Sequence, residues 1–308
     1  MENNQRGAAL IMALFITALV AAAAVAMIDR LHVDIRRTEL ILATTRANFL
    51  AQGSIMWAID QLNNDWLLQQ PQKIVDRMPI TSPTNHVGDA EISSVITDAQ
   101  GYFNINNIIN PALRYDFIHL LNLIAPELTP EQAQEIMFAV ADWISPSSNS
   151  NKDFNQYYNK LNPSYRVPHR LMTSVSELRL VKGITPRLFA KLSPYLIALP
   201  QETPLNINSA STLVLATLSP ALTLDTAKSM MSFRQSTPFL TTQSFLNMDL
   251  IKNSNIAESK ITVKSTYFLV KTNVKVGEQI TTLYTLLQRA VTDTKPHELI
   301  LWQSKGTL

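Results

Sequence analysis

The stretch that most constrains this chain is an apolar run near its beginning. Residues 8–28 (AALIMALFITALVAAAAVAMI) contain no charge, no proline and no amide side chain. A helix of this length can span the hydrocarbon core of a bilayer. A secretory signal peptide would be followed by a small-residue cleavage site and would be removed together with its apolar segment, and no such site follows here. The sequence instead predicts processing at Arg6-Gly7-Ala8, which would leave the hydrophobic helix on the mature chain.

The helical pattern continues beyond the apolar run. From Asp29 onward the sequence becomes amphipathic, and large apolar residues recur seven positions apart. These residues are Ile35, Leu42, Phe49 and Met56. Because Pro71 closes the pattern, we expect one helix over residues 8–69, on the order of 90 Å long at about 1.5 Å per residue. Its first half would lie among lipids or other apolar helices, and its second half would pack on a soluble domain and on partner helices.

Composition narrows the function classes. The chain has 308 residues, a net charge of +2, no cysteine, seven glycines and sixteen prolines. The absence of cysteine excludes a disulfide framework, a thiolate metal site and a cysteine nucleophile. A charge this small does not indicate a nucleic-acid or membrane-surface partner. After the long helix, the remaining length suits one large domain or two small ones.

Two strand pairs are predicted at opposite ends of the soluble part. Residues 87–97 alternate in polarity and lead through a turn into residues 102–108, which predicts a hairpin. Residues 260–271 and 281–291, with a turn at Gly277, predict a second one. The sequence between the hairpins has an almost entirely helical pattern, with capping sequences such as Thr129-Pro130. We expect both hairpins to join one antiparallel sheet, because two strands alone are rarely stable.

The predicted fold is therefore α+β, with a long N-terminal helix packed on a small antiparallel sheet and a large inserted α-helical domain. The predicted parts are a leader over residues 1–7, a transmembrane segment over residues 8–28, an α+β domain formed by residues 29–109 and 256–308, and an inserted helical domain over residues 110–255.

Two parts of the insert resemble helix-hairpin-helix (SAM-like) units. Residues 174–196 and 209–234 each read as helix, short turn and helix. In nucleic-acid proteins such units bind phosphate through backbone amides of a glycine-rich turn. Here the first turn has one glycine, Gly183, and the second has none. Basic residues of the first unit, which are Arg179, Lys182, Arg187 and Lys191, keep DNA binding as an alternative to a compact helical scaffold.

Taken in order, several stretches resemble the K-type minor pseudopilins of type II secretion systems (general secretion pathway protein K, GspK). The matching sequences are RGAALIMALFI, DAQGYFNINN, ADWI, SVSELRLVKGI, LNINSAS and STYFLV. They cover nearly the whole chain, and SELRLVKGI followed by LNINSA is the most specific pair. The resemblance implies a pilin-like fold.

The resemblance also implies how the N-terminus is processed and used. A prepilin peptidase would cut between Gly7 and Ala8, and Ala8 would become the N-methylated first residue. Most pilins carry a glutamate at the fifth mature position, which pairs with the amino terminus of a neighbouring subunit. Met12 stands there in this chain, as would suit a subunit with no other subunit above it.

The resemblance implies a structural subunit at the tip of the pseudopilus that initiates and caps the filament for protein export across the outer membrane. The implied partners are the I- and J-type minor pseudopilins, the major pseudopilin, the inner-membrane assembly platform and the prepilin peptidase, with no nucleic acid. The chain would cross the inner membrane once, with its C-terminal part in the periplasm. The flanking charges do not decide this orientation, since one arginine precedes the apolar run and Arg30, Arg36 and Arg37 follow it.

Calcium is the cofactor that the resemblance raises, because the family binds it in the loop after the ADWI helix. In this chain Ser145 and Ser147 stand where aspartate is usual, and Asp142 and Asp153 are the carboxylates that remain. Calcium favours six to eight oxygen ligands with several carboxylates. The alternative is a polar loop over residues 147–151 that is held by its own hydrogen bonds.

Catalysis has little support in the sequence, and we expect a protein that is not an enzyme. The five histidines are scattered singly, and no hydrolase or phosphate-loop motif occurs. Glu127, Glu131 and Glu135 would share a helix face, which is typical of a solvated surface. Two further interpretations stay open: a membrane-anchored helix-hairpin-helix DNA-binding protein, and a minor pilin of an adhesive type IV filament.

Overall fold

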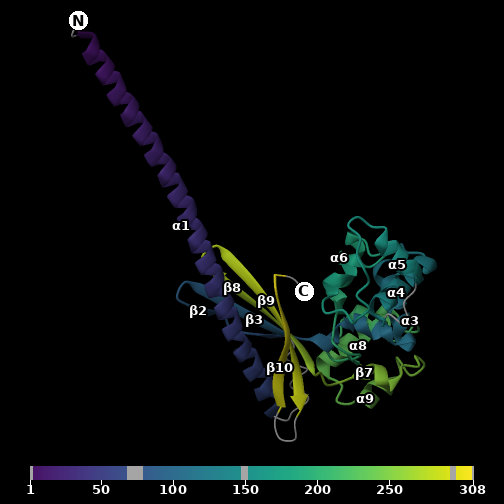
Figure 1. Ribbon diagram of the computed structural model, residues 1–308. Helices are drawn as coiled ribbons and strands as arrows, with labels where there is room; N and C mark the ends of the chain where they lie inside the picture. Colours follow the sequence, from purple (N-terminus) through teal and green to yellow (C-terminus); the bar gives the residue numbers. More distant parts are fainter. Residues whose placement is uncertain (1–2, 68–78, 147–151, 292–295, 307–308) are drawn as a thin grey trace.

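A single long helix organises the structure. The computed structural model describes residues 3–67, 79–146, 152–291 and 296–306. Helix α1 (Asn3–Leu67) runs for 65 residues, which is roughly 100 Å at about 1.5 Å per residue. Its first half projects away from the rest of the protein, and its second half lies across a sheet (Figure 1). The prediction of one continuous helix is confirmed, although Gln69 and Pro71, where we expect its end, lie outside the described residues.

The sheet under α1 is antiparallel and has the strand order β1-β3-β8-β9-β10, with β2 also paired to β3. The strands are β1 (Ile80–Thr81), β2 (Asn85–Val87), β3 (Ala90–Asp98), β8 (Tyr267–Val276), β9 (Gln279–Val291) and β10 (Pro296–Lys305). Strands β3 and β8 are neighbours although they are far apart in sequence, with Ala90 opposite Val276 and Asp98 opposite Phe268. The chain between Asp98 and Tyr267 is thus inserted between two adjacent strands of the sheet (Figure 1).

The C-terminal hairpin prediction is confirmed. All of β8 pairs with residues 279–288 of β9 around Gly277, whose φ of +59° suits a tight hairpin turn. Strand β10, which pairs with β9, was not among the predicted strands.

The N-terminal hairpin prediction is wrong, because residues 102–108 do not return along β3. They form the short strand β4 (Phe103–Asn104), which pairs in parallel with β5 (Leu196–Ile197), and most of the 3-10 turn η2 (Ile105–Ile109). The cause lies at the end of β3. There the Asp98 carboxylate accepts the Gln100 N–H, caps the 3-10 turn η1 (Ala99–Gly101) and directs the chain away from the sheet.

Helix α1 lies close to the sheet because many of the residues that face it are small. Ala47, Ala51 and Ala58 are completely buried against apolar residues of β3, β8 and β9. Neighbouring residues of β8 face opposite sides of the sheet: Phe268 belongs to the core under α1, whereas Leu269 packs against the insert. Helix α1 therefore covers one face of the sheet, and the insert covers part of the other.

The inserted part is helical and has its own core. Its α-helices are α3 (Arg114–Ile124), α4 (Pro130–Ile144), α5 (Lys152–Asn159), α6 (Pro186–Leu192), α7 (Thr212–Ala216), α8 (Leu224–Ser236) and α9 (Thr242–Leu246). Its other 3-10 turns are η3 (Pro111–Leu113), η5 (Val175–Leu180), η6 (Ser193–Tyr195) and η7 (Glu258–Lys260), and a second parallel pair joins β6 (Leu205–Asn206) to β7 (Ile261–Thr262). One large apolar cluster lies among these elements, separate from the cluster under α1.

A buried ion pair fastens the end of α1 to the sheet. Arg289 of β9 donates from Nε to Glu298 of β10 at 3.2 Å and from Nη2 to the Leu62 carbonyl at 2.9 Å. Both charged side chains are almost completely buried. The guanidinium also lies 4.7 Å from the centre of the Phe268 ring. A cation at this position stabilises the carbonyl end of the helix.

We expect Arg289→Met to lower the free energy of unfolding by about 3 to 5 kcal/mol, because it leaves the Glu298 carboxylate buried without its cation. A urea titration of the detergent-solubilised chain, followed by circular dichroism, measures this change. The control is Lys228→Met, which breaks the exposed Lys228–Asp225 pair and should leave the stability unchanged. Equal effects of the two substitutions would contradict the role given to Arg289.

Candidate functional site

The first half of α1 presents only exposed side chains. Every residue from 8 to 28 is exposed, and α1 is the one described helix that could cross a membrane by length and composition. Gly7 and Ala8 both lie within the continuous helix, and Met12 is exposed one turn after Ala8. Cleavage between Gly7 and Ala8 and the role of Met12 remain predictions.

A second apolar surface of α1 turns away from the sheet, and we call it the heptad stripe. It consists of Ile28, Ile35, Leu42, Phe49 and Met56, and each of these side chains is 46 to 71 % exposed. Three alanines, Ile55 and Leu62 of α1 are buried against the sheet, yet the five large apolar side chains of the heptad stripe stay exposed, which an ordinary surface helix would avoid. Apolar residues at seven-residue spacing are the pattern by which one helix packs along another.

A groove of about 390 Å³ runs beside the heptad stripe, between α1 and strands β2 and β3. Phe49, Gly53 and Trp57 line it from the helix, and Val87 and Ile92 line it from the strands. A Cβ atom placed on Gly53 would meet no atom within 4 Å, so the described part of the chain leaves space there. The groove and the stripe form one apolar surface that could receive the helix of another subunit.

The insert is anchored to the sheet through one buried carboxylate, that of Asp98. Its oxygens accept hydrogen bonds from the Gln100 N–H at 2.8 Å, Asn206 Nδ2 at 2.7 Å, Ser209 Oγ at 2.6 Å and Ser265 Oγ at 2.7 Å. Burial raises the pKa of Asp98, while the four donors oppose that rise by stabilising the charged form. The donors come from the beginning, the middle and the end of the inserted chain, so this single group fixes all three.

Two similar modules make up the insert, and each begins with the sequence Asn-Ile-Asn. The first module runs from β4 to β5 and the second from β6 to β7, and each is closed by the parallel pairing of its first and last strands. Asn106 bonds both the N–H and the carbonyl of Met172, and Asn208 bonds both backbone groups of Phe239 in the same way. The side-chain amides thus replace the backbone partners that a longer strand would supply.

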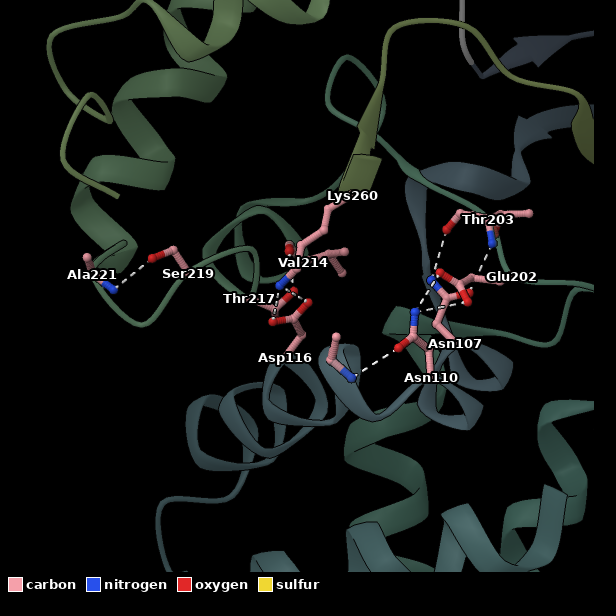
Figure 2. Close-up of polar contacts among 11 residues, drawn as sticks. Asn107, Asn110, Asp116, Glu202, Thr203, Val214, Thr217, Ser219, Ala221 and Lys260 are labelled. Carbon is pink, nitrogen blue, oxygen red and sulfur yellow. Dashed lines mark hydrogen bonds and ion pairs between the residues drawn. The ribbon is translucent and has the colours of Figure 1, made fainter. Parts of the chain in front are cut away.

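The junction between the modules is polar, as Figure 2 shows. Lys260 donates to Asp116 at 2.8 Å and thereby ties the end of the second module to α3 of the first. Asn107 donates to the Thr203 carbonyl at 2.9 Å, and Asn110 bonds the Glu202 carboxylate. Burial raises the pKa of Asp116, and the Lys260 ammonium opposes that rise. These contacts hold the two modules as one body.

The roles of these asparagines were missed by the sequence analysis, although a signal existed. Phe-Asn-Ile-Asn-Asn at residues 103–107 and Leu-Asn-Ile-Asn-Ser at residues 205–209 form an internal repeat. Asparagines repeated on both sides of an isoleucine, here the fully buried Ile105 and Ile207, indicate polar side chains that are needed inside the protein. The partners Met172 and Phe239 have no such signal, because only the tertiary fold brings them there.

We expect Asn106→Ala to lower the free energy of unfolding by about 3 kcal/mol, because three buried backbone groups, of Met172 and Leu199, lose their partner. Thermal and urea unfolding of the detergent-solubilised chain measure the loss. Asn110→Ala is the control, since its contacts are exposed, and it should cost less than about 1 kcal/mol. A similar loss in both variants would show that the hydrogen bonds of Asn106 to the backbone do not hold the first module together.

The turn of the first helix-hairpin-helix unit, which would bind phosphate in the DNA-binding alternative, is engaged inside the protein. Gly183 has a φ of +85°, and a Cβ placed on it would lie 2.7 Å from Ile136, so the turn packs tightly on α4. The Lys182 N–H donates to the Tyr158 hydroxyl at 3.0 Å and is not available to a phosphate. Lys182 and Lys191 form ion pairs with Glu135 and Glu127, and Arg179 stacks on Phe189. This geometry disfavours nucleic-acid binding at the turn.

The glutamates expected on one helix face lie in two places. Helix α4 begins at Pro130, so it carries Glu131 and Glu135 but not Glu127. Glu127 lies in the preceding connection, where it pairs with Lys191.

The described residues after α4 do not fit a calcium site. Asp142 is buried at the end of α4, whereas the side chain of Asp153 and residues 147–151 lie outside the described part. Ser145 donates its hydroxyl to the Ala141 carbonyl at 2.6 Å, and its own carbonyl lies 3.2 Å from Nδ1 of His169. Among the described residues no three His, Asp or Glu side chains are grouped to hold a metal ion. Calcium would need several carboxylates within reach of one point.

Comparison with known proteins identifies relatives over nearly the whole chain. Two family models match, both described as type II secretion system protein K, over residues 101–201 and 205–264. These ranges coincide with the two modules of the insert. Type II secretion system protein K of Klebsiella pneumoniae is 30% identical over 94% of this chain and 94% of the relative, and that of Pseudomonas aeruginosa is 28% identical over 94% and 90%.

A solved structure shows the same fold. It is the crystal structure of the GspK-GspI-GspJ complex from the enterotoxigenic Escherichia coli type 2 secretion system. The match has a TM-score of 0.65 at 19% sequence identity and covers 86% of this chain and 99% of the chain in that structure. The predicted combination of a long N-terminal helix, an antiparallel sheet and an additional helical region is thereby confirmed.

Proposed function

We propose that this chain, which belongs to the type II secretion system protein K family, stands at the tip of the pseudopilus. There, as a minor pseudopilin of that system, it initiates and caps the filament during protein export across the outer membrane. The proposed partners are I- and J-type minor pseudopilins, as in the complex named for the solved relative. The major pseudopilin, the inner-membrane assembly platform and the prepilin peptidase are the further partners. Residues 8–28 cross the inner membrane, the rest lies in the periplasm, and the role involves no catalysis.

The observation that carries this proposal is the heptad stripe. It continues the line of the apolar helix beyond Ile28 and leaves large side chains such as Phe49 and Met56 in solvent. Exposed apolar surface of this extent marks an interaction site. A partner helix that emerges from the same membrane would run alongside α1 and would meet the stripe and the adjoining groove.

The tip position is supported by the place of the insert beside the sheet. The insert leaves the sheet on the face opposite α1 and widens the part of the protein beyond the helix (Figure 1). A subunit stacked above would have to share that space, whereas a terminal subunit would not. Met12 agrees with this position, since a terminal subunit has no neighbour whose amino terminus needs a carboxylate.

We expect the double variant Phe49→Glu and Met56→Glu to fold normally and to bind the I- and J-type pseudopilins at least about tenfold more weakly, because charges would be buried in an apolar helix contact. Both side chains are exposed in the single chain, so folding should not suffer. Co-purification from detergent-solubilised membranes, with affinity measured by titration, checks this expectation.

The control for this experiment is Leu240→Glu, which alters another exposed apolar side chain, on the insert. It should leave the affinity unchanged. Full binding by the stripe variant would refute the assembly role of α1. Normal secretion after deletion of the whole chain, together with altered adhesion, would favour the adhesive-filament interpretation.

We expect a prepilin peptidase to remove residues 1–7 and to leave one methyl group on Ala8. Gly7→Val should block this cleavage almost completely, because a branched side chain would stand next to the cut bond. Intact-mass measurement of the purified chain after co-expression with the peptidase gives the result. Ala9→Val is the control on the other side of the bond, and equal processing of both variants would contradict the assigned site.

A further inference from the structure

Lys182 occupies a partly exposed site at the surface of the first module, formed by one carboxylate and two aromatic rings. Its Nζ lies 2.6 Å from Glu135 of α4. It also lies 5.1 Å from the ring centre of Tyr157 and 5.6 Å from that of Phe154, both on α5. An ammonium group is attracted both by a carboxylate and by aromatic faces. The cation therefore links α5 to α4.

The backbone around Lys182 is held in place, so the side chain is aimed at this site. The tight packing of Gly183 on Ile136 fixes the turn against α4. The Lys182 N–H donates to the hydroxyl of Tyr158, and the hydroxyl of Tyr165 donates to the Leu180 carbonyl at 2.7 Å. Helix α5 and the chain after it are thus fastened to the same turn that carries Lys182.

An aromatic cluster completes the attachment of α5. The ring of Tyr158 lies 5.6 Å from that of Trp143 and 5.4 Å from that of Tyr165, and the Trp143 contact is edge-to-face. Such pairs contribute beyond the area that they bury. Burial raises the pKa of Tyr158 to about 12, so its hydroxyl stays neutral and keeps its role as acceptor of the Lys182 N–H.

We propose that Lys182 acts as a built-in cation at the surface of the first module that fastens α5 to α4, so that this part of the protein needs no divalent metal ion. The family resemblance raises calcium at the loop between these two helices, but the described donors there do not fit it. A lysine ammonium supplies positive charge permanently and without dependence on the metal concentration. The inference concerns the single chain and is independent of any partner.

Hydrogen exchange of α5 tests this proposal directly. In the detergent-solubilised full chain, amides of residues 154–161 should exchange at the same rate with a chelator and with millimolar calcium. Lys182→Met keeps the length of the side chain and removes the charge, and it should accelerate their exchange about five- to tenfold. Lys182→Arg keeps the charge and should restore most of the protection.

Lys191→Met is the matched control, because the Lys191–Glu127 pair has the same 2.6 Å distance and nearly the same exposure but no aromatic rings on α5. It should leave the exchange of α5 unchanged. Slower exchange with calcium, or faster exchange with the chelator, in the unmodified chain would overturn the proposal. So would equal behaviour of the Lys182→Met and Lys191→Met variants.

Discussion

The position of the insert on the sheet depends on Asp98, where the chain leaves strand β3 close to the point at which it returns into β8. Because β3 and β8 are adjacent, the two ends of the insert emerge side by side, and such a connection alone would act as a hinge. The buried Asp98 carboxylate removes that freedom by accepting bonds from Gln100, Asn206 and Ser265, which belong to different parts of the insert. A buried charge is tolerated only when it is fully hydrogen-bonded, and therefore all these contacts are needed together.

The sizes of its side chains allow helix α1 both to pack on the sheet and to keep an apolar surface for another subunit. Alanines such as Ala47 and Ala51 let the helix backbone approach the sheet, and Ile55 and Leu62 are the large helix residues that are fully buried in the core under it. Phe49 and Met56 are then left for the outer side. A sequence that only had to fold as a monomer would place these larger residues inward, where they would bury more apolar area. Their outward position is a cost to the single chain that association would offset.

The parts of the fold that could be predicted are those with local signals. The apolar helix follows from residues 8–28, and the β8–β9 hairpin follows from alternation on both sides of Gly277. The joining of the two ends in one sheet is predicted, because two strands alone are rarely stable, but the register of β3 on β8 could not be derived, because nothing near Ile92 or Val274 specifies it. Apolar content alone predicts a strand over residues 102–108. The Asn104 and Asn106 side chains instead impose a turn and donate hydrogen bonds to backbone carbonyls that are distant in sequence. Such tertiary contacts outweigh local propensity.

The two modules also show which contacts set the framework of the insert. Asn106 and Asn208 hold their modules together by the same pair of hydrogen bonds to the N–H and the carbonyl of one residue. Only the first module contains the Lys182 contacts with α5. The framework is therefore set by the asparagines and by the parallel strand pairs, and helix α5 is an addition to it. An addition can be held by any interaction of sufficient strength. In this chain the contacts of Lys182 with Glu135 and with the rings of α5 are such an interaction.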